Sequence, residues 1–148
     1  MSLRRLLSDG SIEQFQSNQS QINDKMEIAE KHLRAAKKIV TINDVDTDDS
    51  AYLSAYNAIL QTGYALMFSK GYRPKARDKH HLVVQQFIES EFTNDFPLDV
   101  IAIFGAARQT RNTLQYDTTG IITNSEVNNL ISKADVFVNK AKILLNIP

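Results

Sequence analysis

The sequence predicts an all-α protein, a single-domain up-and-down bundle of about five helices. Apolar residues recur at spacings of three and four along most of the chain, and no stretch of useful length alternates with the period of two typical of a strand. Glycine and proline are scarce, at 5 and 3 residues, which favours helices over a turn-rich β fold. A length of 148 residues fits one domain, and short connections favour an up-and-down arrangement.

Residues 1–19 are predicted to form a leader before the bundle of residues 20–148, with a short helix interrupted near the sequence SDGS. The first long helix is predicted over residues 20–40, because apolar side chains follow one of its faces. This stripe consists of Ile22, Met26, Ala29, Leu33, Ala36 and Val40. One face of this helix is therefore expected to pack on the core.

The second helix, over about residues 50–70, has a broad apolar face and is expected to lie centrally. Asp48 or Asp49, in the acidic linker before it, is expected to cap its N-terminus. Gly71 is expected to end it, because glycine tolerates the left-handed conformation that follows a last turn. The next segment, YRPKARD, is predicted to be a loop, since proline disfavours helical conformation in the residue before it.

Three further helices complete the predicted bundle, over about residues 79–91, 97–116 and 123–145. Pro97 is a favoured first-turn residue for the fourth helix. Gly120 is expected to close the turn DTTG that follows. Thr123 and Glu126 have the spacing of a capping box at the start of the fifth helix.

Composition narrows the classes of function. Lys+Arg and Asp+Glu both number 17, so a globally basic nucleic-acid binder is disfavoured, although a local basic patch remains compatible with the sequence. With no cysteine, disulfides, thiolate metal sites and thiol nucleophiles are excluded. No apolar run approaches the roughly 18 residues of a membrane span, and the N-terminus lacks the features of a signal peptide. We therefore expect a cytoplasmic protein that does not contact membranes.

The stretch RQTRNTLQYD, near the end of the fourth helix, is the best candidate site. Arg108, Asn112 and Tyr116 follow one another at four-residue steps on one helix face, with Arg111 alongside. Arginine guanidinium groups suit phosphate, while asparagine and tyrosine can fix a ribose or a base. Alternatively, Arg111 pairs with Asp117 or with a carboxylate on another helix, and the tyrosine packs with its hydroxyl satisfied.

A second candidate is the basic segment KGYRPKARDKHH. Its five cations are Lys70, Arg73, Lys75, Arg77 and Lys79, against a single acid, Asp78. In a neutral protein this local excess predicts phosphate contact, with Arg73 and Lys75 as nucleic-acid ligands. The alternative is a solvated loop that keeps the protein soluble.

His80 and His81 are poorly placed for a metal site. Adjacent residues on a helix point about 100° apart, and the third histidine, His32, is distant in sequence. We expect neither a metal nor a cofactor, since the glycines form no phosphate-binding loop. Either histidine of the pair is nevertheless suited to be a general base, because the ordinary pKa of histidine is about 6.5.

Three segments, in this order, resemble the HEPN domain family: AYLSAYNAILQTGYALMFSKGYRP on the second helix and its exit, HHLVVQQF on the third, and RNTLQYD at the end of the fourth. The resemblance covers about residues 22–145. It implies a helical bundle that forms a homodimer through its later helices, with the arginine motifs of two chains facing a shared cleft. It also implies RNA or a nucleotide as ligand, and a cognate antitoxin or a nucleotidyltransferase as partner.

Many members of that family are metal-independent ribonucleases in toxin–antitoxin, phage-defence or stress systems. Their motif is an arginine, often followed by asparagine, then four to six residues and a histidine. The resemblance assigns these positions to Arg111 and Asn112, but Tyr116 stands where the histidine is expected. Because tyrosine has an ordinary pKa near 10, it is a poor base at pH 7. Losing acid–base help costs about 10² to 10⁴-fold in rate, so this departure predicts binding with weak or lost cleavage.

Three hypotheses follow. The first is a HEPN-like module that binds RNA, a nucleotide or a protein partner in a dimeric cleft around Arg108, Arg111, Asn112 and Tyr116, with catalysis weak or lost. The second is a metal-independent endoribonuclease that combines Arg111 with Tyr116, His80 or His81 as proton carrier. The third is a structural, antitoxin-like dimeric scaffold in which the motif only packs the dimer.

Overall fold

The computed structural model describes residues 1–75, 79–116 and 122–148, apart from the side chains of Gln115 and Tyr116. The described residues form six α-helices and one two-stranded sheet. In chain order these are α1 (Leu3–Ser8), β1 (Ile12–Gln14), α2 (Gln19–Val40), α3 (Val45–Ser69), β2 (Tyr72–Pro74), α4 (His80–Glu91), α5 (Leu98–Tyr116) and α6 (Asn124–Leu144). The prediction of an all-α bundle is confirmed.

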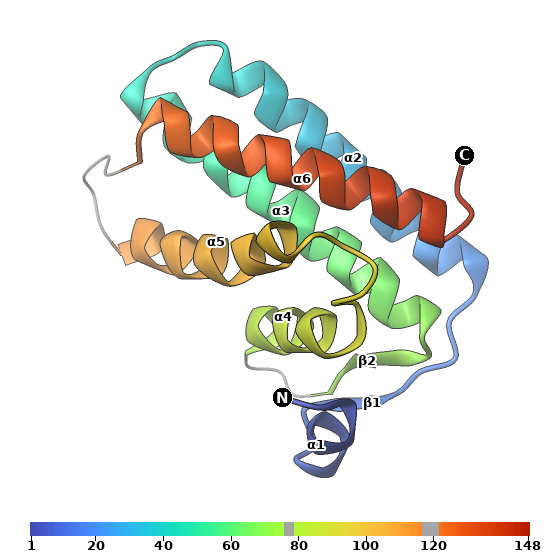
Figure 1. Ribbon diagram of the computed structural model, residues 1–148. Coiled ribbons are helices and arrows are strands. Elements are labelled where there is room, and N and C mark those ends of the chain that lie inside the picture. Colours follow the sequence, from blue (N-terminus) through green and yellow to red (C-terminus); the bar gives the residue numbers. More distant parts are fainter. Residues whose placement is uncertain (76–78, 117–121) are drawn as a thin grey trace.

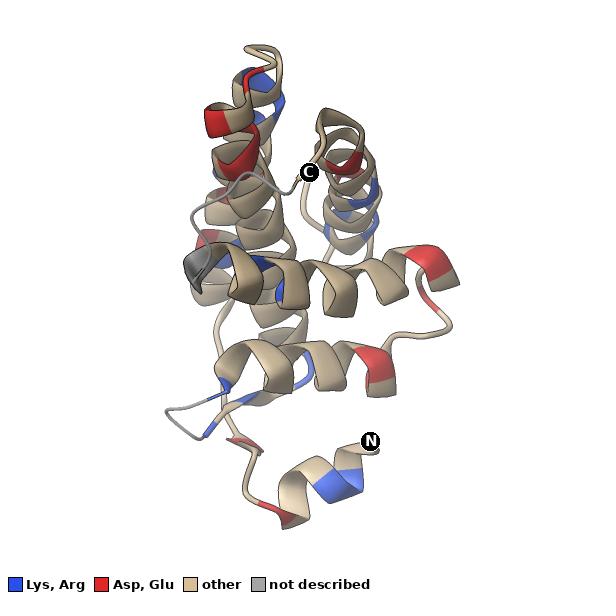
Figure 2. Ribbon diagram, turned by 90° about the vertical axis from the view of Figure 1, so that its left-hand side faces the viewer, with Lys and Arg blue, Asp and Glu red and all other residues tan. Residues whose placement is uncertain are grey.

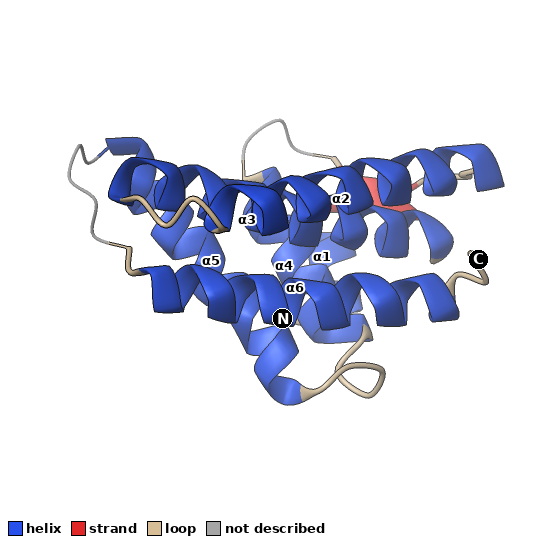
Figure 3. Ribbon diagram, turned by 90° about the horizontal axis from the view of Figure 1, so that it is seen from above, coloured by secondary structure: helices blue, strands red, loops and turns tan. Residues whose placement is uncertain are grey.

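The long helices α2, α3 and α6 lie alongside one another, and α5 and α4 form a second tier against α3 (Figure 1). The view from above shows the same arrangement, with the three long helices covering α4 and α5 (Figure 3). Helix α3 contacts α2, α4, α5 and α6, which confirms its predicted central position. At its close contact with α4 it carries Gly63, where an added Cβ would lie 2.5 Å from Val84 Cγ1.

The N-terminus of α3 differs from the prediction. The helix begins at Val45, about five residues before the predicted start, and Asp44 occupies the N-cap position without a side-chain cap. Capping by Asp48 or Asp49 is therefore wrong. Asp48 lies in the first turn, where a negative charge complements the helix N-terminus, and its Oδ1 accepts a hydrogen bond from Asn124 Nδ2 at 3.3 Å. The end of the helix is as predicted, with Gly71 at a φ of +86°.

The two short strands were not predicted by the sequence pattern. β1 pairs antiparallel with β2, so that Ile12 lies opposite Pro74 and Glu13 opposite Arg73. Three residues are too few for a visible alternation, and a proline is tolerated in a strand at a sheet edge. The segment YRPKARD is thus partly a strand rather than a loop. Completely buried Leu6 and Ile12 attach residues 1–19 to the rest of the fold.

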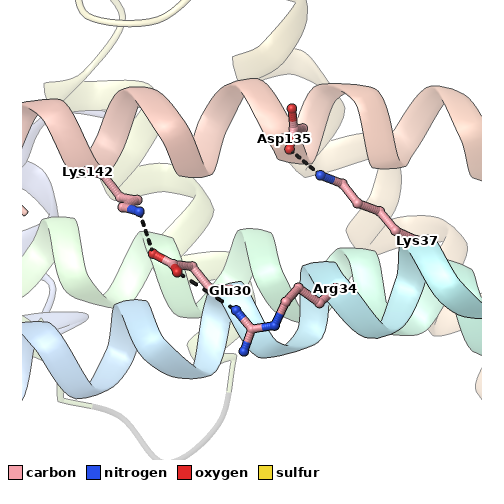
Figure 4. A network of polar contacts seen from close by, with 5 residues as sticks. All are labelled: Glu30, Arg34, Lys37, Asp135 and Lys142. Carbon is pink, nitrogen blue, oxygen red and sulfur yellow. Dashed lines mark hydrogen bonds and ion pairs between the residues drawn. The ribbon is translucent and has the colours of Figure 1, made fainter. Parts of the chain in front are cut away.

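Helices α2 and α6 are joined at the surface by ion pairs (Figure 4). Glu30 on α2 accepts from Lys142 at 3.0 Å, and Lys37 on α2 reaches Asp135 at 2.6 Å. Such pairs, which remain partly open to solvent, contribute at most about 1 kcal/mol each, so the packing of α2 depends mainly on its apolar stripe. That stripe is buried as predicted from Ile22 to Ala36, while Val40 is half-buried.

The remaining helices agree with the predicted boundaries to within one or two residues. Helix α5 starts directly after Pro97. The capping box of α6 is confirmed: Glu126 N donates to Thr123 Oγ1 at 3.1 Å, and Thr123 N donates to Glu126 Oε1 at 3.4 Å. Gly120 lies outside the described residues. None of the described helices has the combination of length and hydropathy that crossing a bilayer requires.

Candidate functional site

A cavity of about 640 Å³ opens between α3, the start of α4 and the second half of α5. Its lining residues are Tyr64, Lys79, His80, His81, Leu82, Arg108, Arg111 and Asn112. The structure therefore brings together two groups that lie about thirty residues apart in the sequence: the arginine motif on α5 and the histidine pair on α4. Among the lining residues that the structure describes, three side chains are cations and none is a carboxylate.

Helix α5 positions its three polar residues through simple periodicity. Arg111 and Asn112 lie three and four residues after Arg108, so the three side chains share one helix face. Phe104 and Ala107, one turn earlier, are buried in the core. Arg111 Nη1 donates to Asn112 Oδ1 at 3.3 Å. Within the described residues, the ion pairs do not include either arginine. Asp117, the predicted alternative partner of Arg111, and the side chain of Tyr116 lie outside the described residues.

Arg108 is oriented by a neighbouring helix. Its Nε donates to Gln85 Oε1 at 2.7 Å, and Gln85 Nε2 donates in turn to Glu89 Oε1 at 3.2 Å. Gly105 makes this contact feasible, because a Cβ there would lie 2.8 Å from Gln85 Nε2. Sequence reasoning missed Gln85 because the pair depends on how α4 packs against α5.

The start of α4 adds a second positive element. Lys79 adopts the left-handed conformation, with a φ of +64°, and provides no side-chain cap. The first turn contains no acid, so nothing in it offsets the partial positive charge of the helix N-terminus. The backbone N–H groups of a first turn have no intrahelical acceptor, and an anion is their natural partner. The sequence carries part of this signal, because the residue directly before His80 is a lysine and not one of the usual capping residues.

His81 is the most strongly perturbed group in the cavity. Burial, together with the nearby charges of Arg111, His80 and Arg108, lowers its pKa to about 4. Its Nδ1 lies 3.0 Å from the hydroxyl of Tyr56, a completely buried residue of α3. Burial raises the pKa of Tyr56 above its ordinary value, outweighing the opposite effect of Arg111 and Arg108. At neutral pH the pair is therefore an uncharged imidazole beside a protonated phenol.

The basic segment lies partly elsewhere. Arg73 Nε donates to Glu13 Oε1 at 2.8 Å, and its guanidinium lies 4.6 Å from the centroid of the Phe15 ring. Lys75 is exposed. Neither residue lines the cavity, so their predicted role as nucleic-acid contacts is a separate hypothesis. Arg77 lies outside the described residues. Across residues 1–75, 79–116 and 122–148, His, Asp and Glu form no group of three suited to a metal ion.

Comparison with known proteins identifies a relative. A protein of Methanocaldococcus jannaschii, named "Putative toxin MJ0142", is 30% identical over 119 residues, covering 79% of this chain and 76% of the archaeal protein. The chain belongs to the family of that archaeal protein. No family model matches the sequence. A continuous match of this extent necessarily includes the centre of the chain, so the cavity lies inside the region shared with this family.

The charge pattern of this family member is organised around the cavity. Figure 2 shows basic residues along α5 and at the start of α4, and acidic residues at the opposite ends of both helices. The chain as a whole has equal numbers of basic and acidic residues, so the positive charge at the cavity comes from where the cations lie and not from a surplus of them. A cavity with guanidinium groups, a lysine and a helix N-terminus is suited to an anion with several acceptor oxygens. The two imidazoles add groups that can donate or accept protons.

Proposed function

We propose that this protein is a HEPN-like module of a toxin–antitoxin, defence or stress system, which binds single-stranded RNA in the cavity between α4 and α5. The observation that carries the proposal is the lining of that cavity, where Lys79, Arg108 and Arg111 meet two imidazoles and, among the described residues, no carboxylate. A phosphodiester presents charged oxygens to such donors, and arginine binds them with two parallel hydrogen bonds. The family relationship to the protein named "Putative toxin MJ0142" supports this context.

RNA is favoured over a simple anion by the remaining lining residues. Tyr64 contributes an aromatic side chain and Asn112 an amide, which are the groups that stack on bases and hydrogen-bond to their edges. A volume of about 640 Å³ holds a nucleotide-sized ligand rather than a lone phosphate. We further propose a homodimer in which two such cavities face each other, and a cognate antitoxin or nucleotidyltransferase as partner.

The binding test compares two arginine variants. In the Arg111→Ala variant, the affinity for a fluorescent single-stranded RNA should fall about tenfold, because a charge-assisted hydrogen bond to phosphate is lost. The matched control is Arg34→Ala, which removes an arginine on α2 with a side chain 64% exposed and only a weak contact to Glu30. Fluorescence anisotropy at several salt concentrations should also show a salt slope smaller by about 0.7 for Arg111→Ala. Equal affinities for the two variants would refute the proposed site.

A second candidate function is metal-independent RNA cleavage. It is favoured by the position of His80 and His81 in the same cavity as Arg111, which supplies proton carriers that the motif itself lacks. In such a reaction a base takes the proton of the 2′-hydroxyl, the 2′-oxygen attacks phosphorus, and the 5′-oxygen leaves with a proton from an acid. The products are a 2′,3′-cyclic phosphate and a 5′-hydroxyl.

The cleavage test uses purified protein and RNA in EDTA, beside the Arg111→Ala and His80→Ala variants. Loss of the cyclic-phosphate product in both variants would support an endoribonuclease. Cleavage that persists unchanged in both would identify a contaminant.

The third hypothesis, an antitoxin-like scaffold, requires Arg111 to be engaged by carboxylates with no open cleft. Its described contact is instead Asn112, at the edge of an open cavity.

A further inference from the structure

Tyr56 is a buried residue that the proposed function does not use, although it reaches the cavity through one hydrogen bond. Its side chain is 0% exposed, and its ring packs edge-on against Phe104, with centroids 6.2 Å apart. The hydroxyl lies 3.0 Å from His81 Nδ1, and no other hydrogen bond of that hydroxyl occurs within the described residues. A buried hydroxyl without a partner is costly, so this contact is a structural requirement for the phenol.

We propose that Tyr56 is a positioning residue that fixes the tautomer of His81, donating its proton to Nδ1 so that His81 presents Nε2–H to a phosphoryl oxygen of the RNA. The opposite arrangement, with Nδ1–H donating to the phenol oxygen, would leave the phenolic hydrogen without a described acceptor in a fully buried position. The phenol is therefore the donor and Nδ1 the acceptor, because Tyr56 is buried with no other described partner for its hydrogen. This assignment rests on the proposed RNA-binding function for its ligand.

The protonation states agree with that direction. Burial keeps Tyr56 protonated, because it raises the pKa of the phenol. Burial and the neighbouring positive charges keep His81 neutral at pH 7. Among the described residues, the charges that lower the pKa of the imidazole are those of Arg111, His80 and Arg108, and each of them disfavours a second proton on the ring. A neutral imidazole that accepts at Nδ1 has its single N–H at Nε2.

The consequence is a division of roles between the adjacent histidines. With its Nε2 protonated, His81 binds a phosphoryl oxygen as a donor and cannot serve as the base without exchanging tautomers. His80 lines the same cavity without a hydrogen bond to Tyr56 among the described contacts, so Tyr56 does not fix its tautomer and its unprotonated ring nitrogen can take a proton. Any cleavage chemistry would thus place the base at His80 and the neutral donor at His81.

The deciding experiment is nuclear magnetic resonance of the ¹⁵N-labelled full-length protein at pH 7, without RNA. Long-range proton–nitrogen correlations report which ring nitrogen of His81 carries the proton. The wild-type protein should show Nε2–H, and Tyr56→Phe, which keeps the ring packing, should show a mixture of tautomers. The control is Tyr52→Phe, one turn earlier on α3, which removes a buried hydroxyl in contact with Thr110, outside the cavity. It should leave the His81 tautomer unchanged.

Binding of single-stranded RNA provides the second readout. Tyr56→Phe should weaken binding by about 3- to 10-fold, the range for one neutral hydrogen bond, while Tyr52→Phe should not. An Nδ1–H tautomer in the wild-type protein, or the same tautomer in wild type and Tyr56→Phe, would overturn the inference even if RNA binds. If the tautomers are as predicted but neither the wild-type protein nor a variant binds RNA, the role of Tyr56 in orienting His81 is supported and the proposed function is refuted. If Tyr56→Phe does not fold, an Nδ1–H tautomer in the wild-type spectrum would still overturn the inference.

Discussion

The neutral, half-buried imidazole of His81 predicts a specific dependence of stability on pH. The pKa of His81 is lowered from 6.5 to about 4 in the folded protein, so the unfolded chain binds a proton more readily. A group with a depressed folded pKa stabilises the protein above the unfolded pKa and loses that contribution as the pH falls toward the folded pKa. Between pH 7 and pH 5 the folded protein should therefore lose stability through this residue.

The size of the effect follows from the two pKa values. A pKa of about 4 in the folded state and 6.5 in the unfolded state corresponds to about 2 kcal/mol lost between pH 7 and pH 5. Because His81 lines an open cavity and is only half-buried, solvent screening reduces this to about 1 kcal/mol. The variant His81→Gln keeps a polar side chain beside Tyr56 and has no titrating group, so it should lack this component.

The assay is urea denaturation followed by circular dichroism, at pH 7 and pH 5, for the wild-type protein and His81→Gln. The pKa values of other groups also shift on folding: that of His32 is lowered by burial and by Lys31, and that of Asp49 is raised by burial and by Asp46 and Asp48. These groups are present in both proteins. The loss of unfolding free energy between pH 7 and pH 5 in the wild-type protein, minus the same loss in His81→Gln, therefore gives the contribution of His81. An identical loss of stability in both proteins would refute the assignment of a neutral, perturbed imidazole at this position.

Three further variants test helix packing, the orientation of Arg108 and the cap of α6. Gly63→Ala should lower the free energy of unfolding by about 1–3 kcal/mol, because the new Cβ would lie 2.5 Å from Val84 Cγ1; an unchanged urea midpoint would contradict this close contact. Gly105→Ala should change stability little, since Gln85 can move and alanine favours helix. It should weaken RNA binding severalfold, because displacing Gln85 also displaces Arg108, which donates to it. Equal anisotropy curves for the variant and the wild-type protein would show that this orientation of Arg108 is unimportant. Thr123→Ala should cost about 1 kcal/mol in thermal denaturation, because it removes the capping box of α6, and an unaltered melting temperature would argue against that cap.

The sequence by itself determined the features that depend on near neighbours. Three such features depend only on residues within about one helical turn, and all are present in the structure: the apolar stripe of α2, the glycine that follows α3 and the capping box of α6. The common face of Arg108, Arg111 and Asn112 is of the same kind, because a helix of known register fixes which side chains lie together.

The start of α3 and the small sheet show the limits of such local patterns. The acidic linker NDVDTDDS predicted a cap at Asp48 or Asp49, but the helix starts earlier and includes both, and buried Asp48 accepts a hydrogen bond from Asn124 of another helix. Strands of three residues that lie about sixty positions apart in the chain leave no periodic signal. In both cases the deciding contact comes from a distant segment.

The candidate site was determined partly by sequence and mainly by tertiary structure. The sequence identified the arginine motif and the histidine pair, but it left open whether they meet. Packing of α4 against α5 joins them in one cavity, and packing of both against α3 places Tyr56 against His81. Burial then sets the protonation of that pair, because the cost of charging a group depends on the atoms around it rather than on its neighbours in the chain.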